Sequence, residues 1–306
     1  MPEHKNLFLC KLWRSRYLYL MLLPAIAYYA VFKYEPMGGL MLAFKKYFAN
    51  KGIMGSPWVG LSNFKRIFIT PDAVTAIINT LQISLCRLVF EFPFPILLAL
   101  LINEMRSNKL KRIYQTIYTF PHFLSWVVVG TMVTNMFAGY GTINALIAFF
   151  GGKTINFLSN QSLFRPLLFI TANWKEMGWS AIIYMAAITS IDPTLYEAAT
   201  VDGANRLQQT WHITLPGIKQ TIVVMFILAV GHMMDAGFDQ IFNLQNSAVK
   251  NVSDIIDTYI YNITFKATPN YGFSTAVGMF KSVINFVMLI LCNGLTKKIS
   301  GKGLFV

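Results

Sequence analysis

Two apolar stretches of this sequence each contain a stripe of polar residues at the spacing i, i+4, i+7 and i+11. The stripes are Thr80, Ser84, Arg87 and Glu91 in one stretch and Ser274, Gly278, Lys281 and Asn285 in the other. This spacing places the members of a stripe on one face of an α-helix. Because a charge in apolar surroundings is costly, each stripe predicts either a path for a polar ligand or a pair of opposite charges.

Two further apolar stretches add charges and rings, with Asn173, Trp174, Lys175, Glu176 and Trp179 in one and His232, Asp235 and Asp239 in the other. Neighbouring residues leave a helix in different directions, so we expect Lys175 and Glu176 to point apart. The candidate residues of a polar path are Arg87, Glu91, Asn173, Trp174, Lys175, Glu176, Trp179, Asp235, Asp239, Lys281 and Asn285. The alternative is internal pairing, of Arg87 with Glu91 and of Lys281 with Asp235 or Asp239.

Other chemistries find no support in the residue patterns. The run Gly151-Gly152-Lys153-Thr154 ends like a phosphate-binding loop, but that loop needs a glycine where Ile147 stands. The cysteines Cys10, Cys86 and Cys292 form neither a disulfide framework nor a zinc pattern, and the histidines are scattered. We therefore predict no catalytic residue, no cofactor-binding residue and no metal site.

The elements that must position these charges are membrane-spanning helices. Of the 306 residues 55% are hydrophobic and 13% are charged, against about 25% in soluble domains. The net charge of +13 comes without a basic helix or an RNA-binding motif, so it fits the loops of a membrane protein better than nucleic-acid binding. Mostly apolar runs of about 20 residues predict an all-α polytopic membrane protein with six transmembrane helices. They lie near 17–34, 74–102, 113–138, 164–190, 218–244 and 271–296.

The loop charges predict the orientation of these spans. Six spans put both termini on one side, and that side carries 13 Lys and Arg against 9 on the other. Six of the nine belong to the segment between the first two spans, and without it the ratio is 13 to 3. The positive-inside rule then places both termini in the cytoplasm. The basic first outer segment breaks the rule, and its length of about forty residues predicts a structured piece. At this orientation Arg87, Lys175 and Lys281 lie near the middle of the membrane.

The cytoplasmic segment between spans four and five, residues 191–217, predicts two short helices that meet at a glycine. Asp192 is a suitable N-cap, and Pro193 fits the first helical position, where an N–H is not needed. Asp202-Gly203 supplies a turn, and a second helix follows until Pro216. Such a knob can fit a groove on a cytoplasmic partner.

These residues resemble the coupling motif of binding-protein-dependent ABC importers, which is EAA followed by Asp-Gly-Ala and ending in Ile-x-Leu-Pro. The matching residues are Glu197, Ala198, Ala199, Asp202, Gly203, Ala204, Ile213, Leu215 and Pro216. Many members carry a further proline where this chain has Gln220. The resemblance implies one transmembrane domain over residues 1–306 in a bacterial cytoplasmic membrane. It also implies a second homologous permease, two cytoplasmic ATPase subunits that bind ATP and Mg²⁺, and an extracytoplasmic solute-binding protein.

The resemblance extends to sugar-importing permeases, in particular the group for oligosaccharides from acidic polysaccharides. It rests on Trp58-Val59-Gly60-Leu61 with Phe64, on Phe238–Leu244 and on Asp257–Tyr261. It implies that the cations of the polar path meet the carboxylates of a uronate-containing oligosaccharide, while Trp174 and Trp179 offer faces for sugar rings. A secondary transporter and a polytopic membrane enzyme are the alternative functions, although the sequence has neither a clear internal repeat nor a catalytic constellation.

Overall fold

The computed structural model of the protein describes residues 13–266 and 268–300, and this part of the chain is helical, with one isolated β-bridge between Lys45 and Trp58. The first elements are α2 (Arg16–Tyr29), η1 (Ala30–Tyr34), η2 (Glu35–Phe44), η3 (Ala49–Lys51), α3 (Gly52–Gly55) and α4 (Ser62–Ile69). The next are α5 (Pro71–Glu91), α6 (Pro93–Asn103), α7 (Asn108–Thr119), η4 (Phe120–Phe123), α8 (Trp126–Phe137), α9 (Thr142–Phe149) and α10 (Gln161–Thr189).

The second half of the chain is built in the same way. It contains α11 (Pro193–Val201), α12 (Arg206–Gln209), η5 (Thr210–Thr214), α13 (Leu215–Gly217), α14 (Lys219–Gly231), η6 (Met233–Asp235) and α15 (Phe238–Leu244). It ends with α16 (Lys250–Ser253), α17 (Ile256–Tyr261), η7 (Asn262–Lys266) and α18 (Tyr271–Ser300).

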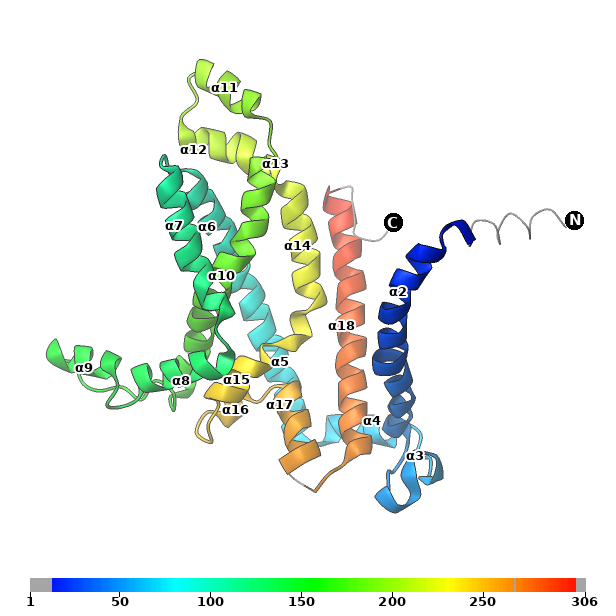
Figure 1. The fold of residues 1–306 in the computed structure, drawn as a ribbon. Coiled ribbons are helices and arrows are strands. Elements are labelled where there is room, and N and C mark those ends of the chain that lie inside the picture. Colours follow the sequence, from blue (N-terminus) through cyan, green and yellow to red (C-terminus); the bar gives the residue numbers. More distant parts are fainter. Residues whose placement is uncertain (1–12, 267, 301–306) are drawn as a thin grey trace, which may run out of the picture.

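The long helices run between two ends of the molecule (Figure 1). Helices α11 and α12 form a protrusion at one end, drawn at the top, where α2 begins and α18 finishes. At the other end lie α3, α4, α8, α9 and α15 to α17. Helices α5 with α6, α7, α10, α14 and α18 connect the two ends, and α2 runs beside α18.

Three helical segments of the described chain are long and apolar enough to cross a membrane, namely Arg16–Phe44, Pro71–Asn103 and Tyr271–Lys298. Two bent helix pairs raise the number to as many as five if each pair is one span. Helix α10 is also long, at 29 residues, but Asn173, Lys175 and Glu176 interrupt its apolar sequence. The apolar helices therefore agree with a membrane protein and give three to five candidate spans.

The predicted span 113–138 is not one straight helix. Residues Asn108–Phe123 and Trp126–Phe149 meet at an angle of 99°. Pro121 has no N–H for continuing the first helix, and the Ser125 side chain accepts a bond from Val128 N at 3.3 Å and so starts α8 as a new helix. The chain consequently turns at this end of the bundle.

The predicted span 218–244 is broken as well. Helix α14 ends at Gly231, and Ala236 and Gly237 have left-handed backbones with φ of 43° and 78° before α15 begins. Left-handed residues stop an α-helix because they turn the following N–H away from its carbonyls. The break brings Asp235 and Gly237 against the α5 stripe that contains Arg87, whose guanidinium lies within 3 Å of a Cβ built on Gly237.

Helix α10 is packed closely against its neighbours. Its buried residues Ala181, Tyr184 and Ile188 form one apolar cluster with Ala99 and Ile102 of α6. Gly178 faces α7 so closely that an added Cβ would overlap the Tyr118 carbonyl oxygen. The charged middle of α10 is therefore held by contacts on both sides.

The basic segment after the first predicted span is folded, as expected. The buried Lys45 donates to the carbonyl oxygens of Ile53 and Met54 at 2.9 and 3.1 Å, and Trp58 stacks on Phe44 at 5.5 Å. Helix α2, in contrast, contains no buried residue. The N-terminal helix thus leaves its apolar sides free in the isolated chain.

Candidate functional sites: a protruding loop and a polar cavity

The protruding loop begins with the predicted cap. The Asp192 carboxylate accepts a bond from the Thr194 N–H at 3.0 Å, and Pro193 is the first residue of α11. This backbone hydrogen bond lowers the pKa of Asp192. The local sequence therefore folds α11 without help from the rest of the bundle.

Gly203 makes the turn between the two helices of the loop. Its φ is 82°, and the next residue, Ala204, donates its N–H to the Ala199 carbonyl at 2.8 Å. Asn205 and Gln208 then form a capping box that starts α12, and the helical path continues through η5 and α13 to Gly217. The predicted pair of short helices meeting at a glycine is confirmed.

The loop presents its motif residues to the outside of the chain. Glu197, Ala198, Asp202, Gly203 and Pro216 are exposed, and the other motif residues, Ala199, Ala204, Ile213 and Leu215, are half-buried. Tyr196 ties α11 to Thr214 by a 2.9 Å hydrogen bond between their hydroxyls. Arg206 lies 3.3 Å from the Glu104 carboxylate at the end of α6. The loop is thus an exposed but braced surface, and Glu104 is a brace that sequence reasoning missed.

A cavity of about 420 Å³ lies between α5 and α6, α10, α14 and the break that follows α14. The predicted path residues that line it are Arg87, Glu91, Asn173, Glu176 and Asp235. Ser84 Oγ, Arg87 Nε and Glu91 Oε1 are buried beside it without a hydrogen-bond partner within the described chain. The cavity therefore combines an apolar wall with polar atoms that have unused bonding capacity.

The remaining predicted path residues lie outside this lining. Trp174 and Trp179 are both about two-fifths exposed on α10, and Trp179 stacks on His122 at 4.4 Å. Asp239 is exposed on α15 and has no ion pair within the described residues. Asn285 donates to the Gly231 carbonyl at the end of α14. The structure thus brings five of the eleven candidates together around one cavity.

Arg87 is paired with a carboxylate one helical turn away. Its guanidinium lies 3.6 Å from Glu91 and also donates to the side chain of Gln240 on α15. The buried Gln240 amide donates in turn to Thr171 on α10 at 2.7 Å. This network joins α5, α10 and α15, and the predicted pairing of Arg87 with Glu91 agrees with it.

The expectation that Lys175 and Glu176 point apart is wrong. Lys175 Nζ lies 2.9 Å from Glu176 Oε1 and donates to the His122 carbonyl at 2.8 Å. The His122 ring lies 2.7 Å from the other oxygen of Glu176. Both long side chains bend toward the same residue before α8, because His122 offers a carbonyl to the lysine and a ring nitrogen to the carboxylate.

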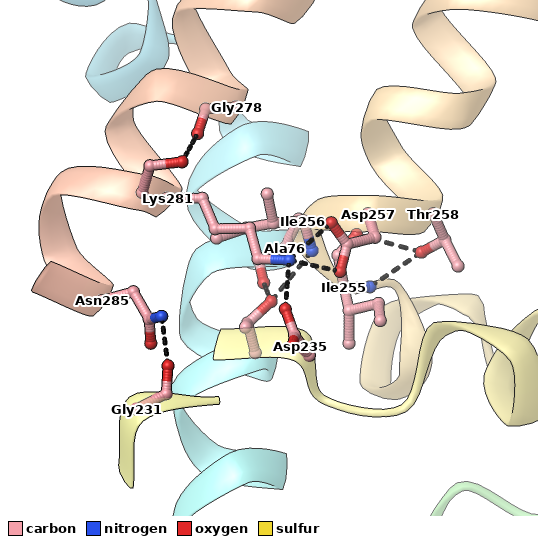
Figure 2. A network of polar contacts seen from close by, with 12 residues as sticks. Ala76, Gly231, Asp235, Ile255, Ile256, Asp257, Thr258, Gly278, Lys281 and Asn285 are labelled. Carbon is pink, nitrogen blue, oxygen red and sulfur yellow. Dashed lines mark hydrogen bonds and ion pairs between the residues drawn. The ribbon is translucent and has the colours of Figure 1, made fainter. Parts of the chain in front are cut away.

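Lys281 of α18 lies between two carboxylates, as Figure 2 shows. Its Nζ is 3.0 Å from Asp235 and 2.9 Å from Asp257 of α17. Burial raises the pKa of Asp257, and the bond from Lys281 opposes that rise. The pairing with Asp235 was one of the two predicted options, whereas Asp239 is not a partner.

The fold and these sites can be compared with known proteins. The family described as "Binding-protein-dependent transport system inner membrane component" matches residues 91–301. The chain belongs to this family. The permease is therefore an inner membrane component of a binding-protein-dependent transport system, which agrees with the first of the functions predicted from the sequence.

Two relatives from Bacillus subtilis (strain 168) match almost the whole permease. The polygalacturonan/rhamnogalacturonan transport system permease protein YteP is 46% identical over 304 residues, covering 99% of this chain and 94% of YteP. Protein LplB is 42% identical over 301 residues, covering 97% of this chain and 94% of LplB.

A solved structure shares the fold. It is a bacterial ABC transporter involved in the import of the acidic polysaccharide alginate, and one of its chains matches with a TM-score of 0.89 and 38% identity. The match covers 95% of the permease and 99% of that chain. The same kind of transporter has been solved with an alginate pentasaccharide-bound periplasmic protein, again at a TM-score of 0.89.

Three partners of the membrane charges were missed by sequence reasoning, namely His122, Gln240 and Asp257. His122 stood out only as one of several scattered histidines. Gln240 and Asp257 lie in stretches that carry the family resemblance, but the spacing within a stretch does not say which distant helix faces it. The only feature of the sequence that could have indicated these partners was therefore their polarity beside apolar runs.

Proposed function

We propose that this permease carries uronate-containing oligosaccharides from a solute-binding protein across the cytoplasmic membrane. The observation that carries this proposal is the match over nearly the whole chain to a permease named for polygalacturonan and rhamnogalacturonan. The likeness to an importer of alginate points in the same direction, since alginate is also named as an acidic polysaccharide. The shared property of these substrates is a carboxylate-bearing chain of sugars.

The proposed topology has six passes and both termini in the cytoplasm, with residues 1–306 as one transmembrane domain. The passes are the α2 segment, α5 with α6, α7 continued by the bent α8, α10, α14 and α18. Support comes from the start of α2 and the finish of α18, which lie toward the end of the bundle that carries α11 (Figure 1). Lys297 and Lys298 at the end of α18 fit the cytoplasmic side.

The proposed partners are two ATPase subunits and a second homologous permease. The ATPases supply the ATP and Mg²⁺ chemistry, and the exposed motif around Glu197 and Gly203 is the surface we assign to them. The second permease is supported by α2, because an apolar helix without any buried residue is suited to packing against another membrane subunit. ATP hydrolysis therefore belongs to the partners and not to this chain.

The proposed polar path includes the five residues that line the cavity, Arg87, Glu91, Asn173, Glu176 and Asp235. The buried atoms of Ser84, Arg87 and Glu91 that lack partners support a role in binding water or sugar hydroxyls. Lys175 and Lys281 act differently in this proposal, since neither lines the cavity and each is bonded to a carboxylate. Trp174 and Trp179 remain candidates for stacking on sugar rings because their sides are partly free.

The test is uptake by the assembled transporter in proteoliposomes, with its binding protein outside and ATP inside. Trigalacturonate should be taken up in an ATP-dependent manner, and maltotriose, a neutral trisaccharide, should not compete with it. Uptake of maltotriose without uptake of trigalacturonate would contradict the acidic substrate class. Uptake by this chain alone, without ATPase subunits, would contradict the proposed partners.

A further inference from the structure

A second polar cavity lies at the end of the molecule opposite to α11. Its volume is about 560 Å³, within the range of small-molecule sites, and it is formed by the end of α15, residues 245–247, α16, α17 and the start of α5. Its lining is mainly polar and includes the side chains of Gln245, Asn246, Lys250, Asn262 and Lys266. None of the residues assigned to the membrane path lines it.

The cavity wall is held in place by hydrogen bonds. Gln245 donates to Ser253 at 2.9 Å, and Asn246 donates to the Leu158 carbonyl at 2.8 Å. Thr258 donates to the Asp254 carboxylate at 2.5 Å, and the Asp254 backbone carbonyl accepts from Asn79 of α5 at 3.0 Å. Together with the bond that the Asn246 side-chain oxygen accepts from the Ala248 N–H at 3.0 Å, these bonds fix two amides and a carboxylate at the cavity wall.

Two lysines of this cavity differ from the cations inside the membrane. Arg87, Lys175 and Lys281 each form an ion pair with a carboxylate within 4 Å, whereas Lys250 and Lys266 form none among the residues that the structure describes, although the charge of Lys250 interacts with the Asp254 carboxylate one helical turn away. Lys266 Nζ lies instead over the rings of Phe242 and Tyr261, at 5.6 and 5.5 Å from their centres. An ammonium beside an aromatic ring therefore remains available for an anion.

We propose that this cavity is an outer subsite for a uronate sugar, occupied while the oligosaccharide passes from the binding protein to the membrane path. The lysines meet the sugar carboxylate, the amides of Gln245, Asn246 and Asn262 bond its hydroxyls, and the Phe242 ring faces its apolar side. Asp72 and Asp254 also line the cavity and accept bonds from sugar hydroxyls. This inference rests on the acidic substrate class proposed above.

The experiment measures binding of trigalacturonate to the assembled transporter in nanodiscs, without the binding protein. The variants Lys250→Gln and Lys266→Gln should each weaken binding by about tenfold, as expected for the loss of a hydrogen bond to a charged group. The carboxyl-reduced trisaccharide should bind equally to wild type and to both variants. Gel filtration of each complex verifies its assembly.

Lys46→Gln is a matched control. Lys46 is also an exposed lysine over a phenylalanine ring, at 5.6 Å from Phe48, but it lies in the segment between α2 and α4 and not in the cavity. Its variant should bind trigalacturonate as tightly as wild type. Equal binding by wild type, Lys250→Gln and Lys266→Gln would overturn the subsite, as would an equal weakening in Lys46→Gln.

The two proposals fail in distinguishable ways. If the wild-type transporter imports trigalacturonate but the cavity variants bind it normally, only the outer subsite is wrong. If the wild type neither binds nor imports trigalacturonate while it imports maltotriose, both the acidic substrate class and the subsite are wrong.

Discussion

Replacing Gly203 should separate coupling from folding, because its backbone conformation is unusual while its surroundings are open. Its φ is 82°, and a Cβ at this position would meet no atom within 4 Å. Alanine therefore adds only the cost of a left-handed backbone, about 1–2 kcal/mol, whereas proline cannot adopt this φ at all. Proline also removes the Gly203 N–H, which donates to the Thr200 carbonyl at 3.1 Å.

The expected consequence is a loss of ATPase stimulation by the binding protein in the reconstituted transporter. A cost of 1–2 kcal/mol lowers the population of the native turn relative to other loop conformations by roughly 5- to 30-fold, so Gly203→Ala should retain partial stimulation and Gly203→Pro should abolish it. Membrane insertion should be unchanged, since α11 and α12 are capped by their own residues.

Gly151 provides the matched control. Its φ is 80°, a Cβ there also meets nothing within 4 Å, and its N–H donates to Ala148 at 2.9 Å, but it follows α9 at the opposite end of the molecule. Gly151→Pro should disturb its turn to the same degree and leave stimulation intact. Full stimulation in Gly203→Pro, or equal loss in both variants, would refute the assignment of α11 and α12 to coupling.

Three further predictions concern stability. Lys281→Met should destabilise the detergent-solubilised complex by about 1.5–3 kcal/mol, because the mostly buried Asp257 loses its partner while Asp235 is largely exposed. Adding Asp257→Asn should restore part of this in thermal unfolding, and a single variant as stable as wild type would contradict the pairing. Gly178→Leu should prevent the close approach of α7 and α10 and lower the yield of assembled complex, whereas Gly294→Leu, with open space around it, should not. Burial raises the pKa of Asp254, so between the unfolded and the folded pKa the folded chain keeps a proton that the unfolded chain loses. The free energy of unfolding should therefore fall as the pH rises through this interval. Asp254→Asn should remove this dependence of stability on pH.

The shape of the protruding loop was predictable from sequence because the forces that form it are local. The cap at Asp192, the proline at the first helical position and the left-handed glycine each act within a few residues. The apolar runs likewise predicted the helical character of the bundle and the position of α18 to within a few residues.

The bends and the charge partners depend on contacts between distant segments. A run of apolar residues does not distinguish one straight span from two helical segments that meet at 99°, as Asn108–Phe123 and Trp126–Phe149 do, because both arrangements bury similar side chains. Helical faces place Lys281 on a polar stripe but do not say that α17 brings Asp257 to it. Lys175 and Glu176 meet only because His122 offers bonds to both, and nothing within α10 predicts that contact.

The pairing of Arg87, Lys175 and Lys281 with carboxylates changes where selectivity for acidic sugars should be sought under the proposed function. Arg87 joins α5 to α15, Lys175 joins α10 to the turn before α8, and Lys281 joins α18 to α17 and to the break after α14. A cation that already has a buried carboxylate gains little from a second one, because the new carboxylate must displace or repel the first. Arg87, Lys175 and Lys281 therefore each hold helices together in this structure. Attraction for a substrate carboxylate should be stronger at a lysine that forms no ion pair, and among the described residues Lys250 and Lys266, at the opposite end from α11, meet that condition.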